Sequence, residues 1–231
     1  LAAGLGREFI GMREATRAPT LGVEAALDRV LSGRGGDPRP VVIADVADNA
    51  GGGAPSDSTF ILQAVLALGM SHAVLGPFWD LGAVHICRDA GVGAVIDLRV
   101  GGKCGPSSGR PVDIRVTVRA VREEHSQDVF GMRWPLGPSA WVETEQGISL
   151  MLSSVRTQAY GTDLFTGLGL TLHDKQLIVV KSSQHFHAAY APLAREVLYV
   201  DTPGAITQDF ARIAFKVRNL DYWPRVADPW G

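Results

Sequence analysis

The sequence has only two cysteines, Cys87 and Cys104, among 231 residues. Two thiols cannot form a disulfide framework, so the composition indicates a reducing compartment and a cytoplasmic location. No apolar run approaches the ~18 residues that a membrane helix needs, and the first residues do not show the pattern of a signal peptide. The net charge is −2, which leaves no general attraction for nucleic acid or an anionic membrane. We therefore expect neither of these as a partner.

Familiar chemical signatures are also missing. The glycines at 51–53 are not followed by the Lys-Ser/Thr pair of a P-loop. His185 and His187 are two residues apart, whereas zinc-binding histidine pairs on a helix are four apart. The sequence contains no complete set of nucleophile, base and metal ligands, so its function has to be inferred from less direct signals.

The sequence does have the composition of a packed domain. Hydrophobic residues make up 46% of the chain, and 27 glycines and 13 prolines indicate many turns. Short apolar runs at 41–44, 73–75 and 94–96 alternate with helical segments, which is typical of parallel strands joined by right-handed crossovers. We expect an α/β fold with a mixed sheet. A parallel βαβαβ core flanked by helices would be joined to an antiparallel hairpin region.

A single domain made of four consecutive segments is predicted. In chain order these are a helical lead-in, a parallel α/β core, a region of antiparallel strands and a returning α/β segment, covering residues 1–36, 37–105, 106–160 and 161–231. Strict alternation over 112–119 and a turn at 145–147 mark the antiparallel region. A buried strand at 177–180, a helix over 184–194 and a last strand at 196–200 form the returning segment.

The loops that follow the predicted parallel strands are the main functional signal. Ligands of open α/β sheets bind beyond the carboxyl ends of the strands. Four loops rich in polar residues or glycine are predicted at that edge, at residues 45–57, 76–80, 98–105 and 181–187. We expect them to converge on one site.

The first of these loops has two interpretations. Its glycines let a ligand approach the backbone, whose N–H groups can hold an anion; they are Gly51, Gly52 and Gly53. Asp45, Asp48 and Asp57 could instead supply oxygen ligands for a hard cation. Alternatively, Asn49 and the glycines form a tight turn while Asp57 charges the start of a helix. The spacing leaves these interpretations open.

The loop after the strand at 177–180 has a similar ambiguity. Lys181, Ser182 and Ser183 could bind a carboxylate or a phosphate, because a lysine, two hydroxyls and a helix N-terminus would meet there. A serine N-cap beside a solvated lysine would explain the same residues structurally, with about 0.5–2 kcal/mol of stability. Of His185 and His187, only one is expected to face inward, and a lone histidine is commonly a hydrogen-bonded structural residue.

Two long motifs resemble the C-terminal domain of the microcystinase C (MlrC) family of metallopeptidases. They are VVIADVADNAGGGAPSD at 41–57 and VVKSSQHF at 179–186. The stretch AAYAPLA at 188–194, which follows the second motif, resembles the same domain. Two shorter stretches, DTPG at 201–204 and YWP at 222–224, are similar to the closing segments of that family. The resemblance covers nearly the whole chain, from about residue 8 to residue 225.

The resemblance implies a zinc-dependent hydrolase that cleaves amide bonds in small or linearised peptides. In such enzymes the metal generates a nucleophilic water and polarises the carbonyl. The family carries its zinc ligands in an N-terminal half, which nothing in these 231 residues matches. The implied zinc is thus held outside this chain, and no cofactor is expected for the chain alone. The implied partners are that N-terminal half of the same polypeptide, a small peptide substrate and, as a further option, a second copy of the chain.

The resemblance also suggests residue roles, although it assigns no catalytic group. The implied substrate-binding residues are Asn49, Gly51, Gly52, Gly53, Lys181, Ser182 and Ser183. Asp45, Asp48 and His185 would orient the substrate or the side chains around the metal. We expect the isolated chain to be inactive. Two other classes stay open, a stand-alone α/β module that binds a small anion or carboxylate and a structural, dimerising domain. If the natural protein is longer, the hydrolase is favoured. If it has 231 residues, the binding module is favoured.

Overall fold

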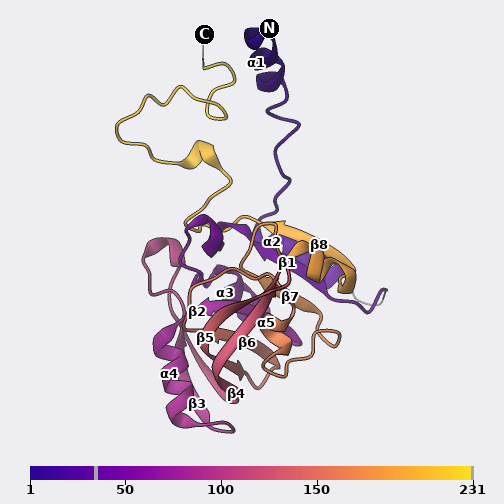
Figure 1. The fold of residues 1–231 in the computed structure, drawn as a ribbon, viewed down its shortest axis with the longest axis vertical. Coiled ribbons are helices and arrows are strands. Elements are labelled where there is room, and N and C mark those ends of the chain that lie inside the picture. The colour runs from indigo at the N-terminus through magenta and orange to yellow at the C-terminus, as the bar shows by residue number, and fades with distance from the viewer. Residues whose placement is uncertain (34–35, 230–231) are drawn as a thin grey trace.

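The computed structural model describes residues 1–33 and 36–229. The predicted segments 1–36 and 161–231 therefore each contain two residues that lie outside this description. The centre of the molecule is an eight-stranded sheet with the order β3-β4-β5-β6-β2-β7-β1-β8, and helices lie against it (Figure 1).

The described residues form the following elements. The strands are β1 (Val41–Asp45), β2 (Ala73–Trp79), β3 (Val95–Val100), β4 (Val112–Val129), β5 (Met132–Glu143), β6 (Ile148–Ser153), β7 (Leu177–Val180) and β8 (Glu196–Val200). The α-helices are α1 (Ala2–Gly11), α2 (Val23–Ser32), α3 (Phe60–Ala67), α4 (Leu81–Ala90), α5 (Asp163–Thr166) and α6 (His187–Tyr190). Short 3₁₀ turns are η1 (Val46–Asp48), η2 (Ala50–Gly52), η3 (Pro106–Ser108), η4 (Ala191–Leu193) and η5 (Phe210–Arg212).

The sheet has a parallel and an antiparallel half, which confirms the predicted mixed α/β class. Strands β6, β2, β7, β1 and β8 pair in parallel, whereas β3, β4, β5 and β6 pair antiparallel. The expectation that residues 94–96 form a third parallel strand is wrong. They lie at the start of β3, which pairs with β4 from Val95↔Thr117 to Val100↔Val112. The alternating strand that follows β3 in the chain supplies this partner, so β3 occupies an edge of the sheet.

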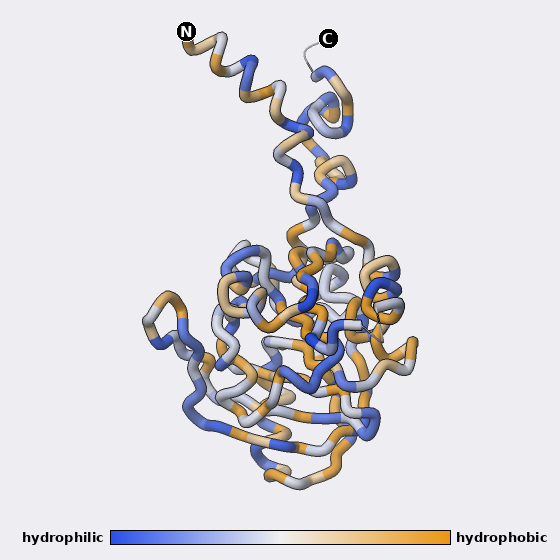
Figure 2. The backbone as a smooth tube through the Cα atoms, turned by 90° about the vertical axis from the view of Figure 1, so that its right-hand side faces the viewer, coloured by the Kyte–Doolittle hydropathy of each residue, from blue (hydrophilic) through white to orange (hydrophobic). Residues whose placement is uncertain are grey.

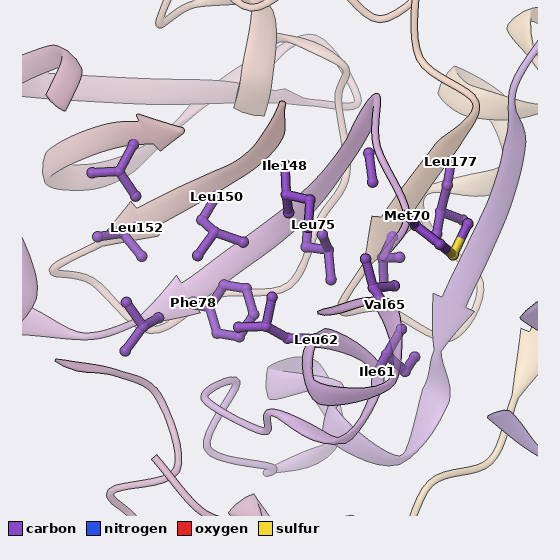
Figure 3. Close-up of a cluster of buried hydrophobic side chains, with 14 of the residues drawn as sticks. Ile61, Leu62, Val65, Met70, Leu75, Phe78, Ile148, Leu150, Leu152 and Leu177 are labelled. Carbon is purple, nitrogen blue, oxygen red and sulfur yellow. The ribbon is translucent and has the colours of Figure 1, made fainter. Parts of the chain in front are cut away.

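Both faces of the parallel half are covered, as the continuous apolar run of β1 predicts. Val41 and Ile43 belong to a core shared with α2, α3 and α4, and Figure 3 shows part of this core around Leu62 and Phe78. Val42 and Ala44 belong to a second core on the opposite face, with α5 and α6. Because each fully buried Val, Leu or Ile contributes roughly 1.5–3 kcal/mol, the two cores hold the carboxyl ends of the strands firmly in place.

Two local predictions have different outcomes. The turn at 145–147 is confirmed, because β5 and β6 form an antiparallel pair that flanks it. The helix expected over 184–194 is reduced to α6 and η4. Pro192 lies in the middle of η4 and supplies no N–H, so an α-helix cannot continue through it. Residues 181–186, ahead of α6, form an irregular loop rather than a helix start.

The two ends of the described chain form an arm that projects from the sheet (Figures 1 and 2). None of the residues of α1 is buried. The indole of Trp223 donates to Glu14, and the guanidinium of Arg13 lies 5.9 Å from the Trp223 ring centroid. Across residues 1–33 and 36–229, no helix combines the length and the apolarity needed to cross a membrane.

Candidate functional site

The four segments predicted to converge do meet beside the carboxyl ends of β1, β2 and β7, although residues 76–79, expected in a loop, are the last part of β2. The amide of Asn49 donates to the hydroxyl of Ser183, which joins the loop after β1 to the loop after β7. The N–H of Trp79 in β2 donates to the carbonyl of Ser56 over 2.8 Å. The loop after β3 joins through Lys103, whose backbone N–H donates to Asp57 over 2.7 Å. The rule that ligands bind at the carboxyl ends of parallel strands therefore accounts for the loops after β1 and β7. It does not account for the loop after β3, because β3 runs opposite to β1, β2 and β7.

Asp48 closes the loop that leaves β1. Its two carboxylate oxygens accept the backbone N–H groups of Ser56 and Ser58 over 2.8 and 2.7 Å, so the chain returns to Asp48 after the glycine-rich excursion. Ser56 is buried and has a φ of +66°, a left-handed conformation that is strained for a residue with a side chain. The carboxylate of Asp48 and the neighbouring strand hold this conformation in place.

Lys181 is the cation of this cluster, and it is 3% exposed. Its ammonium nitrogen lies 2.8 Å from Asp48 Oδ2, 3.4 Å from Asp45 Oδ2 and 2.7 Å from the carbonyl oxygen of Ser58. It also lies 4.7 Å from the ring centroid of Phe78. Burial by itself lowers the pKa of Lys181, but the two carboxylates outweigh this effect and hold the pKa above its usual value. The three ammonium protons are thus directed at partners inside the chain.

Asp45 lies at the end of β1 and is 1% exposed. Thr202 and Ser58 donate their hydroxyls to its two oxygens over 2.9 and 3.0 Å. Burial raises the pKa of the Asp45 carboxyl, and the charge of Lys181 only partly offsets this, while the nearby carboxylate of Asp48 raises it further. Two acids and one lysine share a buried volume, so the ionisation of each depends on the others.

The glycine loop lies on the outside of this cluster, and Gly51, Gly52 and Gly53 are exposed. Their N–H groups already have acceptors in the loop: Asn49 Oδ1, the Asn49 carbonyl and the Ala50 carbonyl, respectively. Gly51 also has a steric reason to be glycine, since a Cβ there would lie 2.6 Å from the side-chain nitrogen of Gln158. The loop is consequently a compact turn, as one of the two interpretations predicted.

Asp80, which directly follows β2, and Lys103 form a second charged pair. Asp80 caps α4 by accepting the N–H of Ala83 over 3.1 Å. The ammonium of Lys103 contacts both oxygens of Asp80 at 2.6 and 2.7 Å, and the N–H of Gly101 donates to the same carboxylate over 2.9 Å. Asp57 accepts from Lys103 and from the N–H of Cys104, over 2.7 and 3.0 Å. These bonds attach the loop after β3 to the site.

His185 is exposed and belongs to a separate, aromatic part of the site. Its Nδ1 lies 3.1 Å from the side-chain nitrogen of Gln158, which also contacts the hydroxyl of Tyr160 at 2.6 Å. The oxygen of the same amide accepts the hydroxyl of Ser182 over 3.2 Å. Gln158 thereby connects the loop after β7 to the aromatic side chains around His185.

The residues chosen from the sequence therefore divide into buried and accessible groups. Asp45, Asp48, Lys181 and Ser182 are buried and bonded to one another or to neighbouring loops. The accessible residues are Gly51, Gly52, Gly53 and His185, with Ser183 half-buried, and the buried Asn49 bridges to Ser183.

Sequence reasoning missed three residues that complete the site. Thr202 follows β8 at the same edge, and the carboxyl-edge rule applied to that strand would have found it. Ser58 directly follows the loop singled out at residues 45–57, yet its spacing gives no indication that it would meet Lys181. Gln158 follows β6, which was expected only as half of a hairpin, although β6 also pairs in parallel with β2.

The residues that the structure describes do not fit a zinc ion. Within residues 1–33 and 36–229, no three His, Cys, Asp or Glu side chains come together as a group that could hold a metal. All four carboxylate oxygens of Asp45 and Asp48 already accept hydrogen bonds from the chain. A cation at this position would compete with Lys181 for the same oxygens.

Comparisons with known proteins give a consistent result. A family model described as MlrC C-terminus matches residues 43–217. Microcystinase C from a Sphingomonas species is 36% identical over 185 residues, which cover 80% of this chain and 36% of the relative. A solved structure from Mesorhizobium sp. BNC1, provisionally described as a metallopeptidase, has the same fold, with a TM-score of 0.80 at 22% identity. That match covers 96% of this chain and 44% of the other. The chain thus spans less than half the length of either relative.

Proposed function

The chain belongs to the MlrC C-terminus family, and on this premise we propose that it is the cleft-forming, C-terminal part of a metal-dependent peptidase. The enzyme would cleave amide bonds in small or linearised peptides. An N-terminal half of the same polypeptide would hold the zinc ion. The likeness to Microcystinase C and to a protein provisionally described as a metallopeptidase supports this assignment. We place the enzyme in the cytoplasm, because two cysteines in 231 residues suit a reducing compartment.

The observation that carries this proposal is the buried cluster of Lys181, Asp45 and Asp48 beneath an accessible glycine loop. Buried charges cost free energy unless they are paired, so a cluster of this kind is retained where a geometry must be held. Lys181 is a positioning residue in this proposal. It holds the loop from Asp48 to Ser58, while Ser183 and the loop surface at Gly51–Gly53 form one wall of the cleft.

The alternative of a stand-alone anion-binding module is less well supported by this geometry. The donors that it would use are Lys181 and the glycine N–H groups, and each has an acceptor inside the chain. An anion would have to displace those bonds before it could bind. We therefore propose no second function.

The projecting arm supplies the surface on which the N-terminal half packs. Along α1, Leu1, Leu5 and Phe9 are spaced four residues apart and form an apolar stripe whose members are 56–103% exposed. Exposed apolar side chains clustered on one element mark interaction surfaces. The N-terminal half is the occupant that we propose, because the chain spans only 36% of Microcystinase C. A second copy of the chain is the competing occupant.

The direct test is to express the complete gene and to measure intact mass, zinc content and peptidase activity on linear peptides. We expect a product longer than 231 residues, about one zinc per chain and turnover, with no turnover from residues 1–231 alone. A metal-free product of 231 residues would contradict the proposal. Turnover by the purified 231-residue chain, with contaminating peptidases excluded, would contradict the assignment of the metal to another segment.

A further inference from the structure

The hairpin between β4 and β5 ends in an unusual turn. Val129 pairs with Met132, so the turn consists of Phe130 and Gly131, and both have positive φ values of +54° and +84°. Two consecutive left-handed residues are the signature of a type I′ turn, whose preferred sequence is Asn-Gly or Gly-Gly. Phenylalanine is strained in this conformation and is nevertheless 73% exposed. The geometry of the turn therefore does not explain why this residue is phenylalanine.

The turn is held rigidly against the body of the protein. Asp163, at the start of α5, accepts the backbone N–H of Asp128 over 2.9 Å and also binds the guanidinium of Arg133 on the other hairpin strand. The contact is close, because a Cβ on Gly161 would lie 3.0 Å from the Asp128 carbonyl oxygen. Both strands are thus fixed beside the turn, and the ring of Phe130 is presented from a defined position.

Phe130 forms an aromatic wall with two residues from other loops. Its ring centroid lies 6.2 Å from that of Tyr160 and 5.8 Å from that of His185, and the rings meet edge to face. Together they border a hollow of about 130 Å³ whose remaining surface includes Gly161, Ala188 and Ala189. A cavity of roughly 150 Å³ holds one benzene molecule, so this hollow matches a single side chain of that size.

The hollow lies beside the loops of the candidate site. His185 contacts Gln158, and Gln158 bonds to Ser182 in the loop after β7. Gln158 also lies directly against Gly51, at the exposed surface of the glycine loop. Gln158 therefore lies between the exposed glycine loop and the aromatic residues that border the hollow.

We propose that Phe130, Tyr160 and His185 form a specificity subsite that receives one aromatic or branched apolar side chain of the peptide substrate. This inference rests on the proposed peptidase function and adds a substrate class to it. A ring or branched side chain would cover apolar surface that is otherwise exposed, and stacked aromatic rings prefer the offset and edge-to-face contacts that these walls offer. The strained conformation of Phe130 is retained because its ring contacts the substrate.

The test uses Phe130→Asn in the protein made from the complete gene. This substitution creates the preferred Asn-Gly turn, so we expect the unfolding temperature to stay the same or to rise. The enzyme is assayed on linear hexapeptides of Ala and Gly that carry one Phe at each position in turn. At the position that fits the subsite, kcat/KM is expected to fall about tenfold, and the all-Ala/Gly peptide to change less than twofold. Trp134→Ala is the matched control, because Trp134 is exposed on the same hairpin but does not border the hollow.

The outcomes separate this inference from the function on which it rests. If the wild type cleaves the peptides and Phe130→Asn does so with the same preference for Phe, the subsite is refuted while the peptidase stands. A lower unfolding temperature together with an equal loss of kcat/KM on every peptide, the all-Ala/Gly peptide included, would show that Phe130 has only a structural role, which also refutes the subsite. If the wild type cleaves none of the peptides, the function fails, and binding of N-acetyl-phenylalanine amide is measured by saturation-transfer NMR. Preference for this compound over N-acetyl-alanine amide, lost in Phe130→Asn, would uphold the subsite, and equal binding would refute it.

Discussion

Replacing Lys181 by methionine tests the buried charge cluster most directly. Methionine keeps an unbranched apolar stem of similar length and removes the charge. In the wild type the ammonium group contacts Asp48 at 2.8 Å and Asp45 at 3.4 Å, and all three side chains are at most 3% exposed. Without it, two carboxyl groups face each other in a region from which water is excluded.

We expect Lys181→Met to lower the free energy of unfolding by about 3–5 kcal/mol at pH 7, since a buried charge left without its partner costs this much. Part of the loss is recovered in acid. The pKa of Asp45 is already raised in the folded state and rises further in the variant. A carboxyl group whose pKa is raised by folding contributes its full stability at a pH below its pKa in the unfolded chain. This contribution is lost as the pH rises through its pKa in the folded protein. The deficit relative to wild type therefore shrinks between pH 7 and pH 4.

The assay is urea unfolding of residues 1–231, followed by tryptophan fluorescence, for the wild type, Lys181→Met, Asp48→Asn and the double variant. Lys181 and Asp48 interact directly, so their effects should not be additive. We expect the free energy of unfolding of the double variant to exceed the value predicted from the sum of the two single losses by about 1–3 kcal/mol. The wild type should also lose stability as the pH rises above 10.5 and through the raised pKa of Lys181. A Lys181→Met protein within 1 kcal/mol of wild type, with additive single effects, would show that the cluster is not stabilising and would refute this reasoning.

Two further predictions concern other parts of the chain. Gly101→Ala should cost about 2 kcal/mol or more beyond Gly69→Ala, measured by urea unfolding. Both positions have a φ of +58°, but a Cβ on Gly101 would lie 2.5 Å from the Asp57 carbonyl oxygen, whereas Gly69 faces open space. Burial lowers the pKa of His125 in the folded protein below 6.5. The neutral, buried imidazole therefore contributes to stability above pH 6.5, and this contribution is lost as the pH falls through the lowered pKa of the folded state. The wild type should lose up to about 1.4 kcal/mol more per pH unit than His125→Gln, and equal losses would contradict this.

Much of the fold could be predicted because its signals are local. The apolar run of β1 predicted a strand buried on both faces, and the alternation in β4 predicted an antiparallel partner. The position of β3 could not be predicted, because a short apolar strand carries no information about which neighbour it pairs with. Residues 94–96 look the same whether they continue a parallel core or begin an edge hairpin.

The candidate site shows the same division. The loops of Asp45 and Lys181 were identified because each follows a strand end, but Lys181 and Asp48 are 133 residues apart, and nothing local shows that they pair. Their mutual burial depends on tertiary packing that brings β7 beside β1. For the same reason Lys181, which was expected to bind substrate, is found inside the protein. Phe130 belongs to no motif, yet it is exposed and borders a hollow.

The position of β7 also has a consequence for how the protein is made. β7 pairs with both β1 and β2, although it is the last strand but one in the chain. During synthesis, β1 and β2 leave the ribosome long before the strand that must lie between them. The nascent chain therefore carries two unpaired apolar strand edges, which are targets for chaperones and for misfolding with a neighbouring chain. Translation that stops before residue 177 would leave β1 without a neighbour in the sheet, because β7 and β8 are the two strands that pair with it.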